Sequence, residues 1–481
     1  MRNDIMLFAI VFVPTIGAFL LPLVGVFSER LRNWLGLLFV LVSLVFSLAL
    51  VPTVMSGDTV SISKPLPGGF SFVLFADGLA VFMAIVSSLI SSIIVFYSHA
   101  YISHYRNQNE YYLMVVLFLG AMMGLVFAGN LILLYLFWEI TAIASWRLIG
   151  FFREKDHVVR ADKAFLVTVF GALAMLLGFI MVHQQAGSFD LSAIKATLGT
   201  NPISGAAVAL ILVGILSKSA TLPFHTWLPD AGVAPSPVTA LLHAAVLVKI
   251  GVYVFARLFV VNLAIGHEWR TAMMVIAAAS ALVSAWAALL ETDMKRLIAF
   301  STVSQIGFIF LGFAENSQIG VAGALLYILM HGIAKGGLFL CAGIVEQNTH
   351  TKDIREMGGL LKTMPVTAVS FLFCAFSVMG IPPFGGFFSK YMVISGAVEG
   401  GQLWIAITFL VGAFLTILYL MRAFNMVFMG DPGPSAAAEG SPVMVACVAL
   451  LGALSLVSGI LIGMSSSFAQ TAARQMLGLI R

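Results

Sequence analysis

The sequence places titratable side chains inside long apolar stretches, where such groups are rare. The set comprises Glu139, Lys218, Lys249, His331, Lys335 and Lys390, with His243 as a further candidate. A charge at the centre of a bilayer costs at least ~2.5–3.5 kcal/mol, so packing alone does not explain why these residues are there. A chain of groups that exchange protons does explain them, and we expect this set to form a proton relay.

The residue types suit proton transfer between neighbours. Desolvation favours the neutral form of a buried lysine, whereas a nearby carboxylate favours the charged form. Glu139 is the one carboxylate deep in the first half of the chain, so we expect it to be the partner of Lys218. His331 and Lys335 are four residues apart and hence on one face of a helix. Histidine titrates near neutral pH, which allows this pair to exchange a proton directly or through one water.

A structural role competes with the relay for several of these residues. Lysines near the end of a membrane helix often extend to the lipid headgroups, an alternative that applies to Lys218, Lys249 and Lys390. His243 could be a hydrogen-bonded histidine of the core. Arg147 is expected to reach the membrane interface and to have a structural role. Whether these side chains lie inside the bundle or at its ends decides between the two roles.

Composition places the elements that carry these residues in lipid. Of 481 residues, 60% are hydrophobic and only 10% are charged, and the mean hydropathy is +1.05. Soluble domains are about half apolar and about one quarter charged. Apolar windows long enough to span a bilayer fill almost the whole sequence, so we expect a single polytopic membrane domain over 1–481. The first window, within 1–27, is longer than the core of a signal peptide and is expected to be a membrane helix.

We expect an all-α integral membrane protein of about fourteen transmembrane helices, because the segments are long continuous apolar runs rather than short alternating ones. The expected helices are 7–27, 34–55, 72–97, 112–128, 130–151, 164–182, 204–224, 236–260, 271–290, 297–314, 320–345, 366–395, 405–428 and 443–464. Lysine and arginine gather in the odd-numbered loops, whereas the even-numbered loops hold only Lys64, Lys195, Arg257 and Arg270. Positive charge stays on the cytoplasmic side. Both termini are therefore predicted outside a cytoplasmic membrane of prokaryotic type.

Two of the expected helices, the seventh and the twelfth, contain breaks. The seventh continues as SKSATLPFHTWLPDAGVAPSP with Pro223, and the twelfth contains Pro382 and Pro383 in SVMGIPPFGGFFSK. Proline removes a backbone donor and clashes with the preceding turn, so both helices should break there. Paired broken helices at matching places indicate inverted repeats around an ion path. We therefore expect helices four to eight (112–260) and nine to thirteen (271–428) to form two inverted five-helix repeats.

The sequence also argues against several classes of function. The net charge of +4 is small and dispersed, which disfavours a nucleic-acid partner. Cys341, Cys374 and Cys447 lie far apart in apolar stretches and lack the spacing of zinc or iron–sulfur ligands. The sequence contains no nucleotide-binding loop and no nucleophile constellation. We expect neither a metal nor a cofactor in this chain, and any redox chemistry would belong to partner subunits.

Five segments of the sequence together resemble a known family. They are SKSATLPFHTWLPDAGVAPSPVTALLHAAVLVKIGVY, LFWEITAIAS, ETDMKRLIAFSTVSQIGF, LMHGIAKGGLFLCAG and GIPPFGGFFSK. These segments are similar to the proton-translocating antiporter-like subunits shared by respiratory complex I, membrane-bound energy-converting hydrogenases and Mrp-type multisubunit Na⁺/H⁺ antiporters. The resemblance covers residues 70–425 and is densest at 217–253.

The resemblance implies roles for the titratable residues and a fold of fourteen helices with two inverted five-helix repeats. Glu139 and Lys218 match the family's switching ion pair, and Lys249 matches the central lysine of the eighth helix. His331 and Lys335 match the relay of the eleventh helix, and Lys390 matches the end of the exit half-channel. The chain departs from many relatives at Arg147, where they have an uncharged residue, and at Lys390, where some have glutamate. It also ends soon after the fourteenth expected helix, without a long lateral helix.

The expected function is that of an ion-pumping subunit inside a redox-driven complex, coupled through neighbouring membrane subunits to quinone reduction or hydrogen evolution. The alternative is a subunit of an Mrp-type Na⁺/H⁺ antiporter, since the two classes share these motifs. The moved ion is then the proton, with sodium as a second ion. An independent solute carrier fits less well, because lysines and histidines spread over five helices suit a proton path better than a substrate pocket. Coupling of the same fold to inorganic-carbon uptake through a soluble partner is a further variant.

Overall fold

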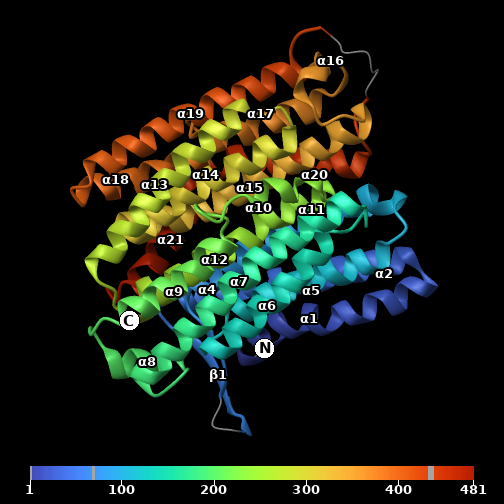
Figure 1. Ribbon diagram of the computed structural model, residues 1–481. Helices are drawn as coiled ribbons and strands as arrows, with labels where there is room; N and C mark the ends of the chain where they lie inside the picture. Colours follow the sequence, from blue (N-terminus) through green and yellow to red (C-terminus); the bar gives the residue numbers. More distant parts are fainter. Residues whose placement is uncertain (1–2, 68–70, 432–437, 481) are drawn as a thin grey trace.

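The computed structural model describes residues 3–67, 71–431 and 438–480, and these residues form a bundle of long helices (Figure 1). Twelve of the described helices are long and apolar enough to cross a membrane. Two shorter apolar helices, α9 (Gly205–Lys218) and α17 (Pro365–Met379), add to them. The prediction of a helical, multi-pass membrane protein is therefore confirmed.

The N-terminal part of the bundle contains a β-hairpin that was not predicted. Its elements are α1 (Asn3–Phe27), α2 (Glu29–Ala49), α3 (Val51–Met55), β1 (Val60–Pro65), β2 (Ser71–Ala76), α4 (Gly78–Tyr101) and η2 (Ile102–His104). The strands pair antiparallel, with Val60 opposite Ala76. The helix expected from residue 72 therefore begins only after β2. Asp77 caps it by accepting a hydrogen bond from the backbone N–H of Ala80 at 2.9 Å.

The middle of the chain holds the first expected group of five helices, and its last helix is irregular. The elements are α5 (Gln108–Val126), α6 (Leu131–Ile149), α7 (Lys155–Ala186), α8 (Leu191–Leu198), α9, α10 (Trp227–Asp230), η3 (Ala231–Val233), α11 (Ser236–Ala240), η4 (Leu241–Ala245), α12 (Leu247–Phe255) and η5 (Ala256–Asn262). Both η4 and η5 are π-helical. One regular helix was expected over 236–260, and the observed π-helical turns are a feature found mostly at functional sites.

The remainder of the chain holds the second expected group and a C-terminal pair. The elements are α13 (His267–Leu290), α14 (Met294–Glu315), α15 (Gln318–Thr349), η6 (Ile354–Glu356), α16 (Leu360–Thr363), α17, α18 (Gly385–Glu399), α19 (Leu403–Phe428), α20 (Pro442–Ile460) and α21 (Ile462–Met476). The last of these, α21, was not predicted, and it packs against α4 and α15.

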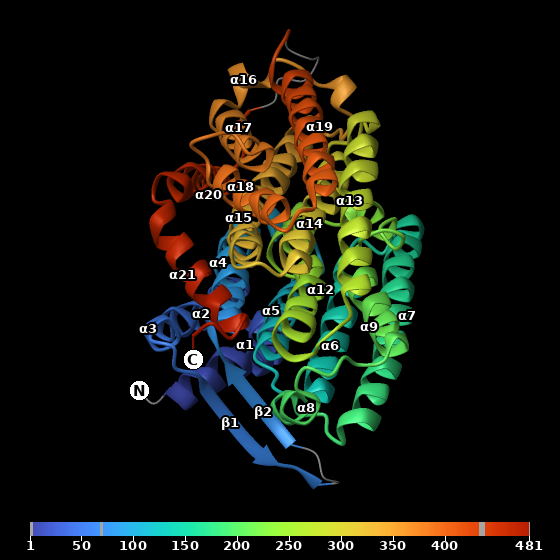
Figure 2. The ribbon, with the colours of Figure 1, turned by 90° about the vertical axis from the view of Figure 1, so that its left-hand side faces the viewer.

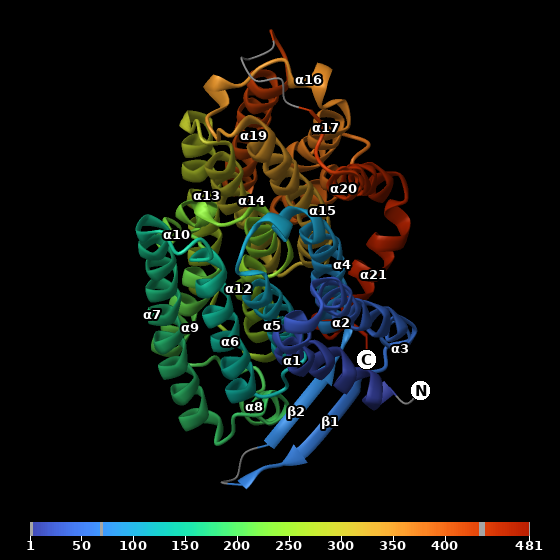
Figure 3. The same ribbon diagram turned by 90° about the vertical axis from the view of Figure 1, so that its right-hand side faces the viewer.

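The loop positions divide the bundle into two ends. The β1–β2 hairpin and α8 lie at one end of the helices and α16 lies at the other (Figure 1). Figures 2 and 3 look roughly along the helices. In these views α12, α14 and α15 lie between α5–α9 on one side and α17–α19 on the other. The most apolar window of α14 or of α15 is 94% buried, against 39% for α1 and for α20. The central helices therefore contact protein on nearly all sides, and the peripheral ones present apolar side chains to lipid.

Both predicted breaks are present. In the first half, α9 ends at Lys218 and the next short helix begins at Trp227. In the second half, α17 ends at Met379 and α18 begins at Gly385. Gly380, between them, has a φ of +83°, a conformation that favours glycine. The prolines in the two gaps cannot supply the N–H that a continuing helix needs.

A buried ion pair ties α4 to the end of the irregular helix. The guanidinium of Arg257 donates to both carboxylate oxygens of Asp77, at 2.6 and 2.7 Å. Arg257 is 2% exposed, and its Nε also donates to the hydroxyl of Tyr253 at 2.8 Å. Arg257 was counted among the loop charges of the sequence, and in the fold it is a buried structural residue instead.

Replacing Arg257 by leucine should destabilise the protein, because the Asp77 carboxylate would stay buried without its counter-charge. Removing one member of a buried ion pair costs about 3–5 kcal/mol. We expect a lower midpoint of thermal unfolding in detergent, measured by intrinsic fluorescence. The double variant with Asp77→Asn should cost less than the sum of the two single variants.

The matched control is Arg355→Leu, which breaks the exposed pair between Arg355 and Asp353 (2.5 Å). Exposed pairs contribute little to stability, so the midpoint should barely move. Equal midpoints for the two leucine variants would contradict the structural role given to Arg257.

Candidate functional site

The first group of five helices contains one carboxylate and one lysine close to each other. Glu139 lies in the middle of α6, and Lys218 is the last residue of α9, fully buried at the break. Their charges are close enough to interact. The ammonium of Lys218 donates to the main-chain carbonyl of Trp138 at 3.2 Å and lies 5.2 Å from the centre of its indole ring. One oxygen of Glu139, Oε1, has no hydrogen-bond partner among the described residues.

Lys249 lies at the centre of the bundle, directly after the first π-helical segment. Its ammonium donates to the carbonyl oxygen of Ala244, within that segment. A Cβ built on Gly332 of α15 would lie 2.6 Å from the Lys249 ammonium nitrogen. The lysine therefore contacts the backbone of α15 beside His331.

Two histidines and a lysine lie around this point. His243, His331 and Lys335 are all fully buried. His331 precedes Gly332, which the Lys249 ammonium contacts, and the His243 ring centre lies 4.5 Å from that of Phe339, one turn along α15 from Lys335. Neither ring nitrogen of either histidine has a hydrogen-bond partner among the described residues. Buried polar groups are nearly always hydrogen-bonded, so these nitrogens are suited to contact water or a proton in transit.

Lys335 begins a network of uncharged polar side chains. Its ammonium donates to the Ser301 hydroxyl at 2.5 Å and to the carbonyl of Ile298 at 3.1 Å. The Ser301 hydroxyl lies 2.7 Å from that of Tyr419, which in turn lies 3.4 Å from Nε2 of Gln305. The hydroxyl of Tyr327 donates to Oε1 of Gln305 at 2.5 Å. All of these side chains are fully buried.

The network ends at Lys390, on the second broken helix. The Lys390 ammonium lies 5.6 Å from the ring centre of Tyr327 and 4.5 Å from that of Phe308. It donates to the carbonyl of Val378 at 2.7 Å. This carbonyl belongs to the last turn of α17, where intrahelical donors are missing. Lys390 therefore holds the two parts of the broken helix together, and at 4% exposure it does not extend to the headgroups.

The four relay lysines share one kind of contact. Each ammonium donates to a main-chain carbonyl, namely those of Trp138, Ala244, Ile298 and Val378. A carbonyl accepts a hydrogen bond from an ammonium and from a neutral amine alike. The carbonyl therefore holds the lysine side chain in place without fixing its protonation state.

The predicted residues fall into two groups. Glu139 and Lys218 form one, and His243, Lys249, His331, Lys335 and Lys390 form the other. Within the described part of the chain, no hydrogen bond or ion pair joins Lys218 to Lys249. Sequence reasoning missed Ser301, Gln305, Tyr327 and Tyr419. The spacing of four residues from Tyr327 to His331 to Lys335, and from Ser301 to Gln305, was the signal that could have indicated them.

Charged residues at the end of the bundle that carries α16 connect the two groups of helices. Asp230, just beyond the first break, accepts from Lys163 of α7 and from Arg296 of α14, each at 2.7 Å. Arg296 also donates to Glu291 at 3.1 Å. Arg147 pairs with Glu110 of α5 rather than with a residue of the relay, which agrees with the structural role expected for it.

Over the described ranges, the protein has no group of three or more histidine, cysteine or acidic side chains placed to hold a metal ion.

Comparison with known proteins gives the family. The profile of the family described as "NADH:quinone oxidoreductase/Mrp antiporter, TM" matches residues 128–416, which include both helix breaks and every predicted relay residue. Two solved structures share the fold. The Mrp complex from Dietzia sp. DQ12-45-1b gives a TM-score of 0.89 over 99% of this chain and 98% of the matched chain, at 23% identity. An archaeal membrane-bound sulfane sulfur reductase gives 0.88 over 98% and 97%, also at 23% identity.

Relatives by sequence include Na(+)/H(+) antiporter subunits A1. Those of Staphylococcus saprophyticus and Staphylococcus haemolyticus are 35% and 34% identical over 94% of this chain. The chain spans only 60% and 61% of the length of these two relatives. The profile alone covers more than half of the chain, and the chain therefore belongs to the NADH:quinone oxidoreductase/Mrp antiporter family of membrane subunits.

Proposed function

We propose that this chain conducts protons across a cytoplasmic membrane as one subunit of a multisubunit Na⁺/H⁺ antiporter. The observation that carries the proposal is the series of buried polar groups between Lys249 and Lys390, in which each lysine is held by a main-chain carbonyl. Relatives named as antiporter subunits favour the antiporter over other complexes. Glu139, Lys218, Lys249, His331, Lys335 and Lys390 are the relay in this proposal, with His243 beside it.

A pocket supports Lys390 as the last residue of the path. Its volume is 400 Å³, and its lining includes Lys390, Ser395 and Glu399. Glu399 ends α18, next to the even-numbered loop that leads to α19. In the proposed orientation, with both termini and the even-numbered loops outside, a proton leaving Lys390 reaches the outer face through this pocket.

The organisation of the chain fits the same proposal. The regions 112–260 and 271–428 each contain a helix broken near a relay lysine, which supports two inverted repeats around the path. In this proposal the chain needs no cofactor of its own, because proton transfer between side chains involves no change in oxidation state. Its partners are other membrane subunits and lipid.

Ion pumping inside a redox-driven complex is the second candidate, and the fold shared with an archaeal respiratory membrane complex favours it. That likeness, at 23% identity, concerns the fold alone.

Purification in mild detergent separates the two candidates. We expect other membrane-embedded antiporter subunits to co-purify with this chain, and we expect proton movement in everted vesicles to depend on added Na⁺. Mass spectrometry of the purified complex and a pH-sensitive fluorescent dye measure these two results. Iron–sulfur or quinone-reducing subunits in the complex, with transport indifferent to Na⁺, would support the redox-driven alternative.

Loss of a titratable side chain from the relay should stop transport. In everted vesicles that contain the complete complex, Lys218→Ala, Glu139→Ala and Lys335→Ala should each reduce dye-detected proton movement to background, because each removes a proton-carrying group. Lys362→Ala, at an exposed position, is the control and should transport normally. Normal transport in Lys218→Ala or Glu139→Ala, with normal assembly of the complex, would refute the relay.

The uncharged network makes a separate prediction. Tyr327→Phe keeps the aromatic ring beside Lys390 but leaves Oε1 of Gln305 buried without its donor. A buried acceptor left unsatisfied costs about 1–3 kcal/mol, so we expect the transport rate to fall roughly tenfold. Tyr112→Phe, the same change at a tyrosine of α5 whose hydroxyl has no hydrogen-bond partner among the described residues, should have no effect. Equal rates in the two variants would show that protons do not need the Tyr327 hydroxyl.

A further inference from the structure

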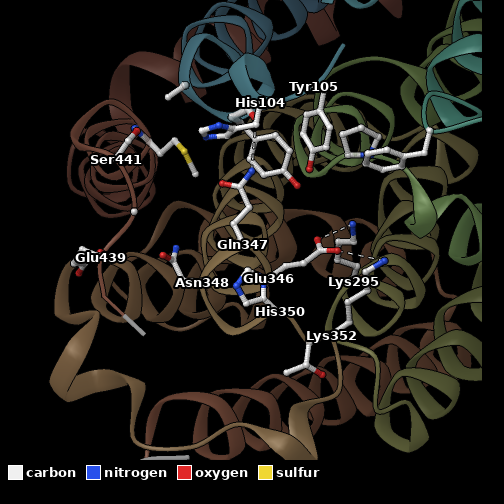
Figure 4. A pocket seen from close by; sticks show the side chains of 17 residues that line it. His104, Tyr105, Lys295, Glu346, Gln347, Asn348, His350, Lys352, Glu439 and Ser441 are labelled. Atoms are coloured by element: carbon white, nitrogen blue, oxygen red, sulfur yellow. Dashed lines mark hydrogen bonds and ion pairs between the residues drawn. The ribbon is translucent and has the colours of Figure 1, made fainter. Parts of the chain in front are cut away.

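Among the residues that the structure describes, a large polar pocket lies at the end of the bundle opposite the Lys390 pocket. Its volume is 790 Å³, and residues from six odd-numbered loops and helix ends line it (Figure 4). Polar and titratable side chains dominate the lining, among them His104, Lys295, Glu346 and His350. Odd-numbered loops are on the cytoplasmic side in the proposed orientation, so the pocket faces the water from which an antiporter subunit would exchange protons.

A partly buried charge cluster marks the inner wall of this pocket. In Figure 4, Lys295 and Lys352 both point toward Glu346, near the end of α15. The distances from their ammonium nitrogens to the carboxylate oxygens are 2.9 and 3.3 Å. Lys295 is 2% exposed, whereas Glu346 and Lys352 are 22% and 35% exposed. Because both lysines are already paired with Glu346, the pocket is poorly suited to recognise an anionic ligand.

A line of hydroxyl groups leads from Glu346 toward the relay. The Ser236 hydroxyl donates to Glu346 Oε2 at 3.3 Å. Ser236, Thr239 and His243 follow one another at spacings of three and four residues along α11 and η4, the spacing of one helix face. This segment packs against α15, and all three residues are fully buried. His243, with both ring nitrogens unpartnered within the described residues, lies at the inner end, where its ring centre is 4.5 Å from that of Phe339, one turn along α15 from Lys335.

A glycine of α15 leaves space beside the Ser236 hydroxyl. A Cβ built on Gly343 of α15 would lie 3.0 Å from the Ser236 hydroxyl oxygen, 2.6 Å from its Cβ and 2.9 Å from the hydroxyl of Tyr97. Both hydroxyls therefore face the bare backbone at Gly343. Any side chain there would fill the space between them.

We propose that this pocket is the site at which the relay exchanges protons with the cytoplasm, with Glu346 as the first proton acceptor and His243 as the point of delivery. A proton from water binds the Glu346 carboxylate and passes through the hydroxyls of Ser236 and Thr239, with water between them, to a ring nitrogen of His243. His243 then hands it to Lys335, and each donor regains a proton from the group before it. Transport in the other direction reverses these steps.

This inference rests on the proposed function, and two substitutions test it in the complete complex. Glu346→Gln removes the titratable carboxyl and keeps its shape, and Gly343→Ala places a methyl group between Ser236 and Tyr97. We expect each to lower the initial rate of proton movement in everted vesicles by at least roughly tenfold. Glu346→Asp keeps a carboxyl group and should restore part of the rate, which a purely structural role of Glu346 would not predict.

The control is Gly336→Ala, two turns from Gly343 on the same helix. A Cβ there would be 3.4 Å or more from its neighbours, an ordinary contact, so the rate should be unchanged. If Gly343→Ala prevents assembly of the complex, the Glu346 variants decide the question alone.

The result for Lys335→Ala separates failure of this inference from failure of the relay. Normal rates in Glu346→Gln with an inactive Lys335→Ala would overturn the uptake site and leave the relay standing. Normal rates in both would overturn the relay itself. Equal loss in Glu346→Asp and Glu346→Gln would also overturn the proposal, because the carboxyl would then have no role as a proton acceptor.

Discussion

The structure depends on how four lysines are accommodated in surroundings with little water. A buried ammonium without hydrogen-bond partners is too costly to keep, and a carboxylate favours the charged form of a lysine beside it. Here each ammonium instead donates to a main-chain carbonyl. This neutral acceptor offsets part of the desolvation cost and remains a suitable partner after the proton has left. The side chain is thus fixed in position while its charge is free to change.

Irregular helices supply some of these carbonyls. A regular α-helix uses its interior carbonyls for its own N–H groups. The carbonyl that holds Lys390 lies in the last turn before the second break, and the one that holds Lys249 lies in a π-helical segment. The second break and the π-helical turn therefore supply acceptors for two of the four lysines, and the proposed path passes through distorted rather than ideal helices at these two points.

The sequence was sufficient to predict the charged part of the site, because a lysine or glutamate inside an apolar stretch is too costly to be kept for packing alone. It also predicted both breaks, because Pro223 and Pro382 exclude a continuous helix. It did not predict the network around Gln305 and Tyr327, because serine, tyrosine and glutamine are tolerated in membrane helices for many reasons. The polar pocket around Glu346 was equally hidden, since its lining comes from six separate regions that only the fold brings together.

The length of α15 has a mechanical consequence. This helix has 32 residues and a length of about 48 Å, well beyond the ~30 Å of the hydrocarbon layer. It is enclosed by other helices, so bilayer thickness does not limit it. Tyr327, His331, Lys335, Gly343 and Glu346 all belong to this one rod. In the proposed relay, a small rotation or slide of the rod would alter the contacts of all five side chains and backbone positions simultaneously.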